Sequence, residues 1–313
     1  MIYSKNRLRR GLVDLIKKVV IPAAGLGTRL FPATKQQPKE MLPIFCKSTN
    51  GDICVKPLLQ EVFEQLYDFG FREFCFIVGR GKRSIEDHFT PDNNCVSMLK
   101  ENKRTCQAYD LDAFYQKLRN SRIIWVNQPE PKGFGDSVLV AQPFVQNENC
   151  LVHAGDTHIF SRQAEHIRLL INTYEKLKAD VAFTVQEVGD TKQYGIIEGE
   201  EIEEGIYRIR KVVEKPEMPP TNLAIMAIYC FSPAIFKALE NTAPSRSGEI
   251  QLTDAIQQII DWGLNVYAVR LNRNNFWLDI GSPETYWEAL NLSYQFSVKK
   301  PESVAAIPVL QEN

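Results

Sequence analysis

The alternation of short apolar runs with segments of helical spacing constrains the fold of this chain most strongly. Runs rich in β-branched and aromatic residues, each bounded by polar turns, stand at residues 19–21, 74–78, 123–126 and 150–154. Such runs are typical of strands that are buried on both faces of a parallel sheet. The pattern therefore predicts an α/β fold built on a mixed, mainly parallel sheet.

Two helical segments lie between such strands. Pro57 opens a segment with apolar residues at helical spacing as far as Phe69, and Gly70 follows where a C-terminal cap is expected. A second amphipathic helix is expected at residues 164–177, before a strand at residues 181–188. Because strands and helices alternate, we expect a Rossmann-like, doubly wound sheet with helices on both faces.

The pattern changes after residue 188. Shorter β-like stretches occupy residues 194–198, 207–213 and 223–231, and we expect them to be antiparallel strands added over the ends of the parallel sheet. Such strands could build a substrate lobe. Further helices are expected at residues 233–240 and 249–262, a strand at 266–271, and a last helix from Pro283.

The pattern also sets the expected boundaries. Residues 1–17 are polar and basic and read as an N-terminal extension, while residues 298–313 read as a loose C-terminal tail. The folded domain is expected at residues 18–297. The charged stretch 92–119 is longer than a connection between two sheet strands requires, which indicates an insertion with its own role.

Composition excludes several functional classes. The 313 residues are 44% hydrophobic and 24% charged, with a formal net charge of -1, so a molecule-wide nucleic-acid surface is not expected. No run of about eighteen apolar residues is present, and the N-terminus lacks the apolar core of a signal peptide, so we expect a cytoplasmic protein without a membrane span. The seven scattered cysteines fit neither a disulfide framework nor a zinc site, and we expect them to be reduced.

A glycine-rich loop, Pro-Ala-Ala-Gly-Leu-Gly-Thr-Arg at residues 22–29, follows the first strand. Bare backbone N–H groups in such a loop can approach phosphate oxygens closely. Arg29 and Lys39 add two cations that could hold a phosphate, although a solvated pair beside a structural turn would look the same. The third glycine of a dinucleotide motif is missing, and Pro32 and Pro38 interrupt the helix that should follow it, so a nicotinamide oxidoreductase is disfavoured.

Acidic residues stand at two strand ends. Asp156 follows the strand at residues 150–154, and Asp279 follows another apolar run. Carboxylates at the edge of a parallel sheet suit Mg²⁺, which prefers oxygen ligands, although a Gly-Asp turn is often only a turn. The adjacent Glu214 and Lys215 could offer a hydroxyl acceptor and a phosphate clamp, or simply a surface ion pair. The four histidines lack metal-ligand spacing, and no Ser stands in a G-x-S-x-G setting.

In combination, these motifs resemble the bacterial-type UTP–glucose-1-phosphate uridylyltransferases over about residues 18–292. The resemblance rests on the segments 22–29, 38–43, 79–83, 155–156, 213–216 and 248–256, together with Gln128, Gly133 and Gly135. The wider family of sugar-phosphate nucleotidyltransferases, thymidylyltransferases included, shares part of this set. The insertion and the segments 79–83 and 248–256 favour the uridylyl branch, whereas Asp156-Thr157 and residues 276–281 depart from it.

The resemblance implies a role for individual residues. A nucleotide part at about residues 18–160 would bind the nucleotide, and a sugar-binding part at about residues 161–297 would bind the sugar phosphate. Arg29, Lys39 and Lys215 would be the catalytic cations. The implied nucleotide-binding residues are Ala24, Gly25, Gly27, Thr28, Arg29, Lys39, Gln128 and Gly133; the sugar-phosphate residues are Gly195, Glu214, Lys215 and Asn222; and the Mg²⁺ ligands are Asp156 and Asp279.

The implied reaction joins UTP and glucose 1-phosphate to give UDP-glucose and pyrophosphate in a single in-line displacement that depends on Mg²⁺. The alternatives are a thymidylyltransferase that uses dTTP and a non-catalytic regulatory relative. We also expect a homo-oligomer, either a dimer or a tetramer. The last helix, with Tyr286, Trp287 and Leu290, could contact another subunit, although a stripe that faces the protein's own core explains these residues equally well.

Overall fold

The computed structural model describes residues 16–272 and 274–298. The expected N-terminal extension and C-terminal tail lie outside the described residues, apart from residues 16, 17 and 298. Ile16 is fully buried in the core.

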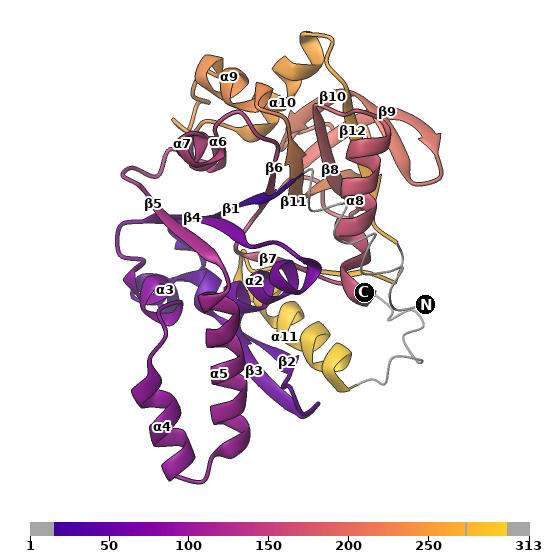
Figure 1. Ribbon diagram of the computed structural model, residues 1–313. Coiled ribbons are helices and arrows are strands. Elements are labelled where there is room, and N and C mark those ends of the chain that lie inside the picture. The colour runs from indigo at the N-terminus through magenta and orange to yellow at the C-terminus, as the bar shows by residue number, and fades with distance from the viewer. Residues whose placement is uncertain (1–15, 273, 299–313) are drawn as a thin grey trace.

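A nine-stranded sheet runs through the molecule (Figure 1). One half is parallel. Strand Lys18–Ala23 pairs in parallel with Glu73–Gly79 and with Cys150–His153, and Glu73–Gly79 also pairs in parallel with Arg122–Gln128. The strands lie in the order β5 (Arg122–Gln128), β4 (Glu73–Gly79), β1 (Lys18–Ala23), β6 (Cys150–His153), β11 (Leu223–Phe231), β8 (Val181–Glu187), β12 (Val266–Arg270), β10 (Ile206–Glu214) and β9 (Gly195–Glu203).

The other half of the sheet mixes both directions. Strand β11 is antiparallel to β6 and β8, β8 is parallel to β12, and β10 is antiparallel to β12 and β9. The mixed α/β class is thus confirmed. The expectation that all antiparallel strands lie over the ends of the parallel sheet is wrong for β11, which occupies a central position. Its almost fully buried apolar run explains this position, because a central strand is covered on both faces.

Two hydrophobic cores cover the two faces of the sheet, and alternate residues of β1 contribute to opposite cores. Val19 and Ile21 pack in the core that includes α2 (Leu58–Phe69) and α8 (Glu165–Lys176). Val20 faces the other core. The helices of that second core are α6 (Phe134–Leu139), α7 (Gln142–Val145), α9 (Ala234–Asn241) and α10 (Leu252–Asp261).

Helix α2 has the boundaries that the sequence predicts. Pro57 precedes it, and Gly70 ends it with a φ of 136°, a conformation that suits glycine. The Gly70 N–H donates to the carbonyl of Leu66 at 3.2 Å. On the buried face, Phe63 lies 4.9 Å from Phe74 between ring centroids, which anchors the helix to β4.

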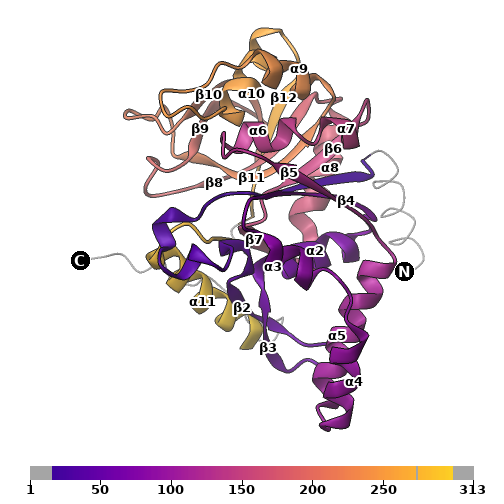
Figure 2. The same ribbon diagram turned by 90° about the vertical axis from the view of Figure 1, so that its left-hand side faces the viewer.

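The charged insertion forms a helical arm. Helices α4 (Asn93–Glu101) and α5 (Thr105–Arg119) follow the short α3 (Arg83–His88) and project away from the sheet (Figures 1 and 2). Asp92 caps α4 by accepting a hydrogen bond from the Asn94 N–H at 2.9 Å.

Two small antiparallel sheets lie below the main sheet in Figure 2. One pairs β2 (Pro43–Lys47) with β3 (Ile53–Pro57), and the other pairs β7 (Thr157–Phe160) with β13 (Phe276–Asp279). The last helix, α11 (Pro283–Val298), packs against β2 and β13. Within residues 16–272 and 274–298, no helix has the length and apolar character needed to cross a bilayer. All seven cysteines are free.

Candidate functional site

A cavity of about 420 Å³ collects most of the predicted site residues. It lies where the loops after β1, β5 and β6 meet the end of β10. Two larger cavities, of about 880 and 610 Å³, contain none of those residues. The predicted residues that line the smaller cavity are Ala24, Gly25, Gly27, Thr28, Lys39, Gln128, Gly133, Asp156, Glu214 and Lys215.

The glycine-rich loop forms one wall of the cavity. Gly27 adopts a left-handed conformation with a φ of 63°, and its carbonyl accepts a hydrogen bond from the Thr34 hydroxyl at 2.7 Å. Three short 3₁₀ turns, Thr28–Leu30, Ala33–Lys35 and Lys39–Met41, stand where the motif would have one helix. The long helix of a dinucleotide-binding motif is therefore missing here, as the two prolines predict.

Lys39 and Asp156 form an ion pair inside the cavity, and both side chains are mostly buried. Burial alone would lower the pKa of Lys39, but the negative charges of Asp156 and Glu40 outweigh it and hold that pKa above its usual value. Burial likewise would raise the pKa of Asp156, but Lys39 keeps it lowered. Both groups are therefore charged at neutral pH.

Asp279 lies beside this pair. In the β7–β13 ladder Asp279 is paired with Thr157, and the Ile280 N–H donates to the Asp156 carbonyl at 3.1 Å. Burial and the charge of Asp156 raise the pKa of Asp279 to about 7, although Lys39 and Arg29 act in the opposite direction. Two segments about 120 residues apart in sequence are thus joined here, and they bring two carboxylates within electrostatic reach of each other.

This pair of carboxylates has the donor chemistry for a hard cation. Burial and the charge of Asp156 disfavour ionisation of Asp279, and a positive ion shared by the two carboxylates would offset both effects. Among the described residues, no group of three or more His, Cys, Asp and Glu side chains is arranged to hold a metal ion. A divalent cation at Asp156 and Asp279 would therefore complete its shell with water and with phosphate oxygens of a substrate, as Mg²⁺ commonly does.

Arg29 does not line the cavity. Its guanidinium donates to Gln193 Oε1 at 3.0 Å. It also lies close to Asp279: a Cβ atom added to Gly281 would be 3.1 Å from both Arg29 Nη2 and Asp279 Oδ2. The structure thus places this predicted phosphate-binding cation on the Asp279 side of the site.

Gln128 organises the loop opposite the glycine-rich loop. Its amide nitrogen donates to Asp136 Oδ2 at 2.7 Å and to the Gly133 carbonyl at 3.2 Å, while its amide oxygen accepts from the Ser137 hydroxyl at 2.7 Å. Gly133 has a φ of 96° and begins α6. A Cβ atom at Gly133 would lie 2.8 Å from Glu249 Cβ, so glycine is required by both conformation and space.

Glu214 is the last residue of β10, Lys215 follows it directly, and both line the same cavity. Lys215 Nζ lies 3.4 Å from Glu214 Oε1, so the pair is an ion pair and also part of the cavity wall. Gly195 pairs with Glu214 in the β9–β10 ladder, which brings it next to the carboxylate without lining the cavity. Asn222 is exposed and does not line the cavity; its carbonyl accepts from the Val188 N–H at 3.0 Å.

Several lining residues were not singled out individually by the sequence. Glu40 is buried against the cavity, where its carboxylate pairs with Lys82 at 2.7 Å. Glu249 and Gln251 line the cavity from the segment before α10. The runs at residues 79–83 and 248–256, both quoted as motifs above, contain Lys82, Glu249 and Gln251, and this was the available signal. Their roles depend on contacts between distant segments.

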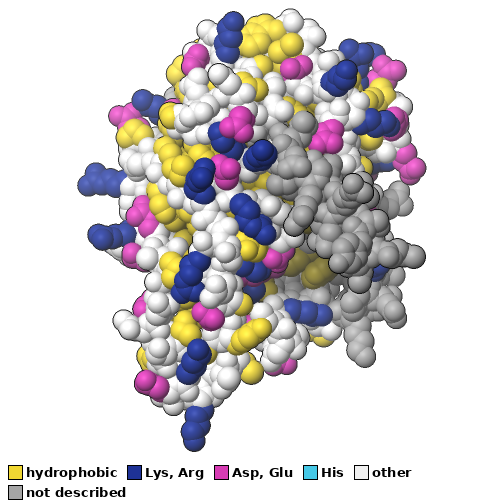
Figure 3. All heavy atoms as spheres, viewed as in Figure 1, with side chains coloured by type: hydrophobic (Ala, Val, Ile, Leu, Met, Phe, Trp, Pro, Cys, Tyr) yellow, Lys and Arg dark blue, Asp and Glu magenta, His cyan; other side chains and the backbone are white. Residues whose placement is uncertain are grey.

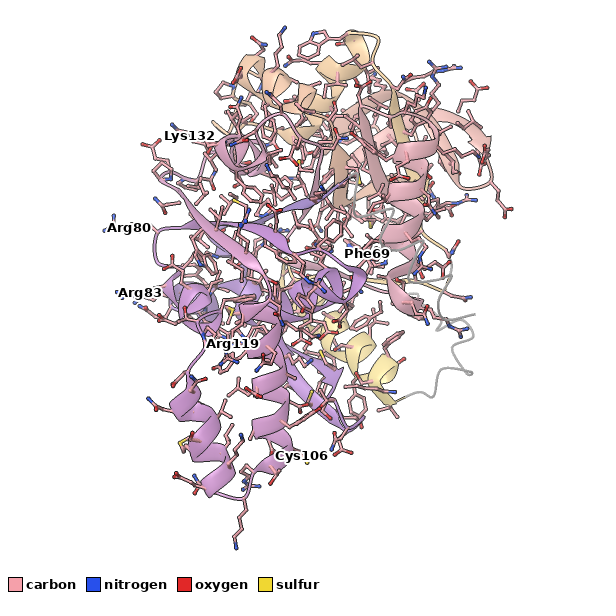
Figure 4. The ribbon with its side chains drawn as sticks, viewed as in Figure 1. Phe69, Arg80, Arg83, Cys106, Arg119 and Lys132 are labelled. Carbon is pink, nitrogen blue, oxygen red and sulfur yellow. The ribbon has the colours of Figure 1, made fainter. Side chains whose placement is uncertain are left out.

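On the face that Figure 3 shows, Lys and Arg side chains are interspersed with Asp and Glu side chains, and several Lys and Arg side chains protrude along its left-hand edge. Figure 4 identifies Arg80, Arg83 and Lys132 there, all pointing outward from the segments that follow β4 and β5. Lys132 stands between Pro131 and Gly133, which both line the cavity. Lys132 Nζ forms an ion pair with Glu130 Oε2 at 2.9 Å, so its positive charge is partly offset.

Comparison with known proteins shows which family the chain matches. A sequence profile described as "Nucleotidyl transferase" matches residues 18–295. A UTP–glucose-1-phosphate uridylyltransferase of Pseudomonas aeruginosa is 36% identical over 292 residues, which covers 91% of this chain and 98% of that protein. A Staphylococcus epidermidis protein of the same name is 37% identical over 291 residues, covering 92% of this chain and 94% of that one.

Solved structures agree with these sequence matches. A UDP-glucose pyrophosphorylase complexed with UDP-glucose superimposes with a TM-score of 0.76 at 34% identity, covering 90% of this chain and 99% of that one. A UTP-bound UGPase from Acinetobacter baumannii also has a TM-score of 0.76, at 28% identity, and covers 92% of this chain and 95% of that one.

Proposed function

This chain belongs to the nucleotidyl transferase family, and on that premise we propose that it transfers the uridylyl group of UTP to glucose 1-phosphate. The products are UDP-glucose and pyrophosphate. The relatives named as UTP–glucose-1-phosphate uridylyltransferases match the chain along nearly its whole length, which supports this pair of substrates.

One observation carries the proposal. A single cavity is lined by the glycine-rich loop, by the Lys39–Asp156 ion pair and by the Glu214–Lys215 end of β10. The first two suit a nucleoside triphosphate, and the third suits a sugar phosphate. A site that holds both substrates at once is what a direct transfer between them requires.

The reaction needs no proton acceptor from the protein. A phosphate oxygen of glucose 1-phosphate attacks the α-phosphorus of UTP and forms a new P–O bond. The bond from that phosphorus to the oxygen bridging the α- and β-phosphates breaks, and the electron pair leaves with pyrophosphate. The work left to the protein is to align the two anions and to offset their repulsion.

The nucleotide lies against the glycine-rich loop in this proposal. The backbone of Ala24 and Gly25 reads the base together with Gly133 and the loop that Gln128 organises. Gly27 and Thr28 continue this wall towards the phosphates. Lys39, together with Arg29, holds the triphosphate. Lys39 is suited to this role because its side chain is charged and mostly buried in the cavity wall. A phosphate oxygen would replace the Asp156 carboxylate as its partner.

We propose that Asp156 and Asp279 hold a divalent cation, with Mg²⁺ as the favoured ion. The fit rests on two neighbouring, partly buried carboxylates, of which Asp279 has a pKa raised by burial and by the charge of Asp156. A bound divalent cation supplies positive charge to the phosphates and neutralises charge that develops on the leaving pyrophosphate. Asp156, freed from Lys39, would then be held by the cation and by the backbone around Ile280.

The antiparallel part of the sheet forms the sugar-binding lobe in this proposal. Glu214 accepts hydrogen bonds from sugar hydroxyls, and Lys215 binds the phosphate of glucose 1-phosphate. Gly195 leaves room beside the Glu214 carboxylate, since any side chain there would approach it. Asn222 shapes the outer part of the lobe. On this basis residues 18–160 form the nucleotide part and residues 161–297 the sugar-binding part.

The proposal is tested by measuring pyrophosphate release with Mg²⁺ across a matrix of substrates. UTP, dTTP, ATP, CTP and GTP are each combined with the 1-phosphates of glucose, galactose and N-acetylglucosamine. We expect UTP with glucose 1-phosphate to give the dominant rate. A preference for dTTP would move the base specificity to the thymidylyl relatives, and no release with any pair would contradict catalysis itself.

We also propose that the protein is a homo-oligomer, either a dimer or a tetramer. Helix α11 supports this, because Trp287 is 65% and Tyr294 48% exposed on its surface. Light scattering after size exclusion would give the mass directly. A mass equal to that of one 35.8 kDa chain would contradict the proposal.

A further inference from the structure

Residues 249–253 bridge the two halves of the proposed site, a role that the sequence motif containing them did not reveal. The segment enters from the loop after α9 and leads into α10. It contacts the nucleotide-side loop at one end and the sugar-side carboxylate at the other. Glu249 and Gln251 also line the cavity between these two contacts.

The contact on the nucleotide side is made by backbone atoms. The Ile250 N–H donates to the Lys132 carbonyl at 2.7 Å, and the Gly135 N–H donates to the Ile250 carbonyl at 2.9 Å. No side chain fits between the two segments, because a Cβ atom at Gly135 would lie 2.7 Å from the Ile250 oxygen. The segment is therefore fixed to the loop that begins α6.

The contact on the sugar side is made by Thr253. Its hydroxyl donates to Glu214 Oε2 at 3.1 Å. Thr253 is only 5% exposed and lies in the first turn of α10, so its hydroxyl has little freedom to move. A Cβ atom at Gly195 would lie 2.7 Å from Thr253 Cγ2 and 3.3 Å from Glu214 Oε2. The Thr253 methyl group and the Glu214 carboxylate thus share a tightly filled space.

This hydrogen bond and the ion pair with Lys215 engage different oxygens of Glu214. Glu214 Oε1 faces Lys215 Nζ at 3.4 Å, whereas Oε2 is committed to the Thr253 hydroxyl. A carboxylate on a flexible side chain loses rotational freedom when it binds a ligand, and a fixed donor reduces that loss. The orientation that Thr253 imposes is therefore set before the sugar arrives.

We propose that Thr253 is a positioning residue that holds the Glu214 carboxylate ready for sugar hydroxyls, and that residues 249–253 fix this arrangement to the nucleotide-side loop. The inference rests on the proposed function and deepens it. Thr253 touches neither substrate. Its effect passes through Glu214, and so it acts on the sugar phosphate and not on UTP.

The test compares Thr253→Val with Thr253→Ser in steady-state kinetics with each substrate varied in turn. Valine keeps the shape of threonine but lacks the hydroxyl, and serine keeps the hydroxyl. We expect Thr253→Val to raise the KM for glucose 1-phosphate about tenfold, the factor that corresponds to one hydrogen bond to a charged group, and to change the KM for UTP less than twofold. Thr253→Ser restores the sugar KM to within about threefold of wild type.

A double-substitution cycle separates positioning from a general effect on folding. If Thr253 acts only through Glu214, adding Thr253→Val to Glu214→Ala, which removes the acceptor, raises the sugar KM no further than Glu214→Ala alone. Additive effects of the two changes would overturn the inference, as would an unchanged sugar KM or an equal rise in both KM values. If Thr253→Val does not fold, Thr253→Ala is read by the same criteria.

The wild-type protein keeps this test distinct from the test of the proposed function. Absence of UDP-glucose formation by wild type contradicts the proposed function. Normal activity of wild type combined with a wild-type sugar KM in Thr253→Val contradicts only the positioning role.

Discussion

At the scale of single residues, the site is a set of opposite charges that hold one another in place. Lys39 pairs with Asp156, Lys82 with Glu40, and Lys215 with Glu214. The first two pairs are mostly buried, and such pairs add little net stability, because desolvation offsets the attraction between the charges. In the proposed function, these pairs hold charged groups in the cavity wall, where substrates can exchange places with the partner charges.

Lys215→Ala tests the charge that the proposal assigns to the sugar phosphate. We expect kcat to fall about 100- to 1,000-fold, which corresponds to ~2–4 kcal/mol of lost transition-state stabilisation. The melting temperature should stay close to that of wild type, because the Lys215 side chain is about half exposed. Lys211→Ala, on the exposed face of the same strand, is the matched control and should keep full activity. A near-normal rate for Lys215→Ala would remove its assigned role.

Buried histidines make the stability of the fold depend on pH. Burial lowers the pKa of His153 to about 4 and that of His158 to about 3, and it also lowers the pKa of His166. Between about pH 6.5 and pH 4 the unfolded chain binds protons at these groups and the folded chain does not. The histidine contribution to the free energy of unfolding therefore decreases as the pH falls through this range.

Urea unfolding at a series of pH values measures this contribution. The pKa of Asp279 is raised, so Asp279 acts in the opposite direction: its contribution is lost as the pH rises towards about 7. Comparison of wild type with His166→Leu isolates one histidine, and we expect the variant to lose less stability between about pH 6.5 and pH 4. The prediction would be contradicted if the free energy of unfolding depended on pH in the same way in wild type and in His166→Leu.

At the scale of elements, the site depends on glycines where two loops touch. The loop that begins α6 approaches residues 249–250 so closely that Gly133 and Gly135 leave no space for side chains. The first turn of α6 and the segment before α10 are held together by this contact, and both line the cavity or lie beside it. Packing of this density transmits a small displacement directly to the site.

Gly133→Ala tests this close approach. The added methyl group would lie 2.8 Å from Glu249 Cβ and 2.9 Å from the Ile250 oxygen, so one of the two segments must move. We expect a loss of about 1–3 kcal/mol in the free energy of unfolding from overpacking, together with a higher KM for UTP.

A matched glycine separates the clash from backbone strain. Gly263 also has a positive φ, 78°, but a Cβ atom there would meet no atom within 4 Å. Gly263→Ala should therefore show only the strain of the left-handed conformation and leave the KM for UTP unchanged. If Gly133→Ala and Gly263→Ala changed the free energy of unfolding and the KM for UTP equally, packing against residues 249–250 would be unimportant.

At the scale of the whole molecule, one continuous sheet supports both halves of the site. In the proposed function, strands β1 and β6 carry the nucleotide side, and β10 carries the sugar side. Strand β11 lies next to β6 and also contacts β9 at one residue pair. Binding of both substrates therefore stabilises the sheet as a unit, because only the folded chain brings their contacts together.

Thermal unfolding with and without ligands tests this linkage and the metal site together. UTP with Mg²⁺ should raise the melting temperature, with a gain of about 2.7 kcal/mol when the ligand is at one hundred times its Kd. EDTA should abolish both this gain and the enzymatic activity, and added Mg²⁺ should restore them. In Asp156→Asn we expect no restoration by Mg²⁺. A metal-independent rate in wild type would contradict the roles of Asp156 and Asp279.

Much of the local structure could be predicted from the sequence. The strands around Val20, Phe76 and Val152 and the helix ended by Gly70 follow from patterns within about a dozen residues, because burial and capping act locally. The glycine-rich loop, Lys39, Asp156 and the Glu214–Lys215 pair could be named as candidates for the same reason, since each stands at the end of a predicted strand or within a turn.

The tertiary structure alone decided how these pieces meet. The central antiparallel position of β11 depends on pairings between strands that are far apart in sequence. The resemblance named Asp156 and Asp279 together, but the β7–β13 ladder that brings their segments side by side is seen only in the structure. The same holds for the hydrogen bond from Thr253 to Glu214, which joins residues 39 positions apart. Sequence patterns record which face of an element is buried, but they do not record its partner. The partner is chosen by the packing of the complete core, in which every strand and helix must be covered at the same time.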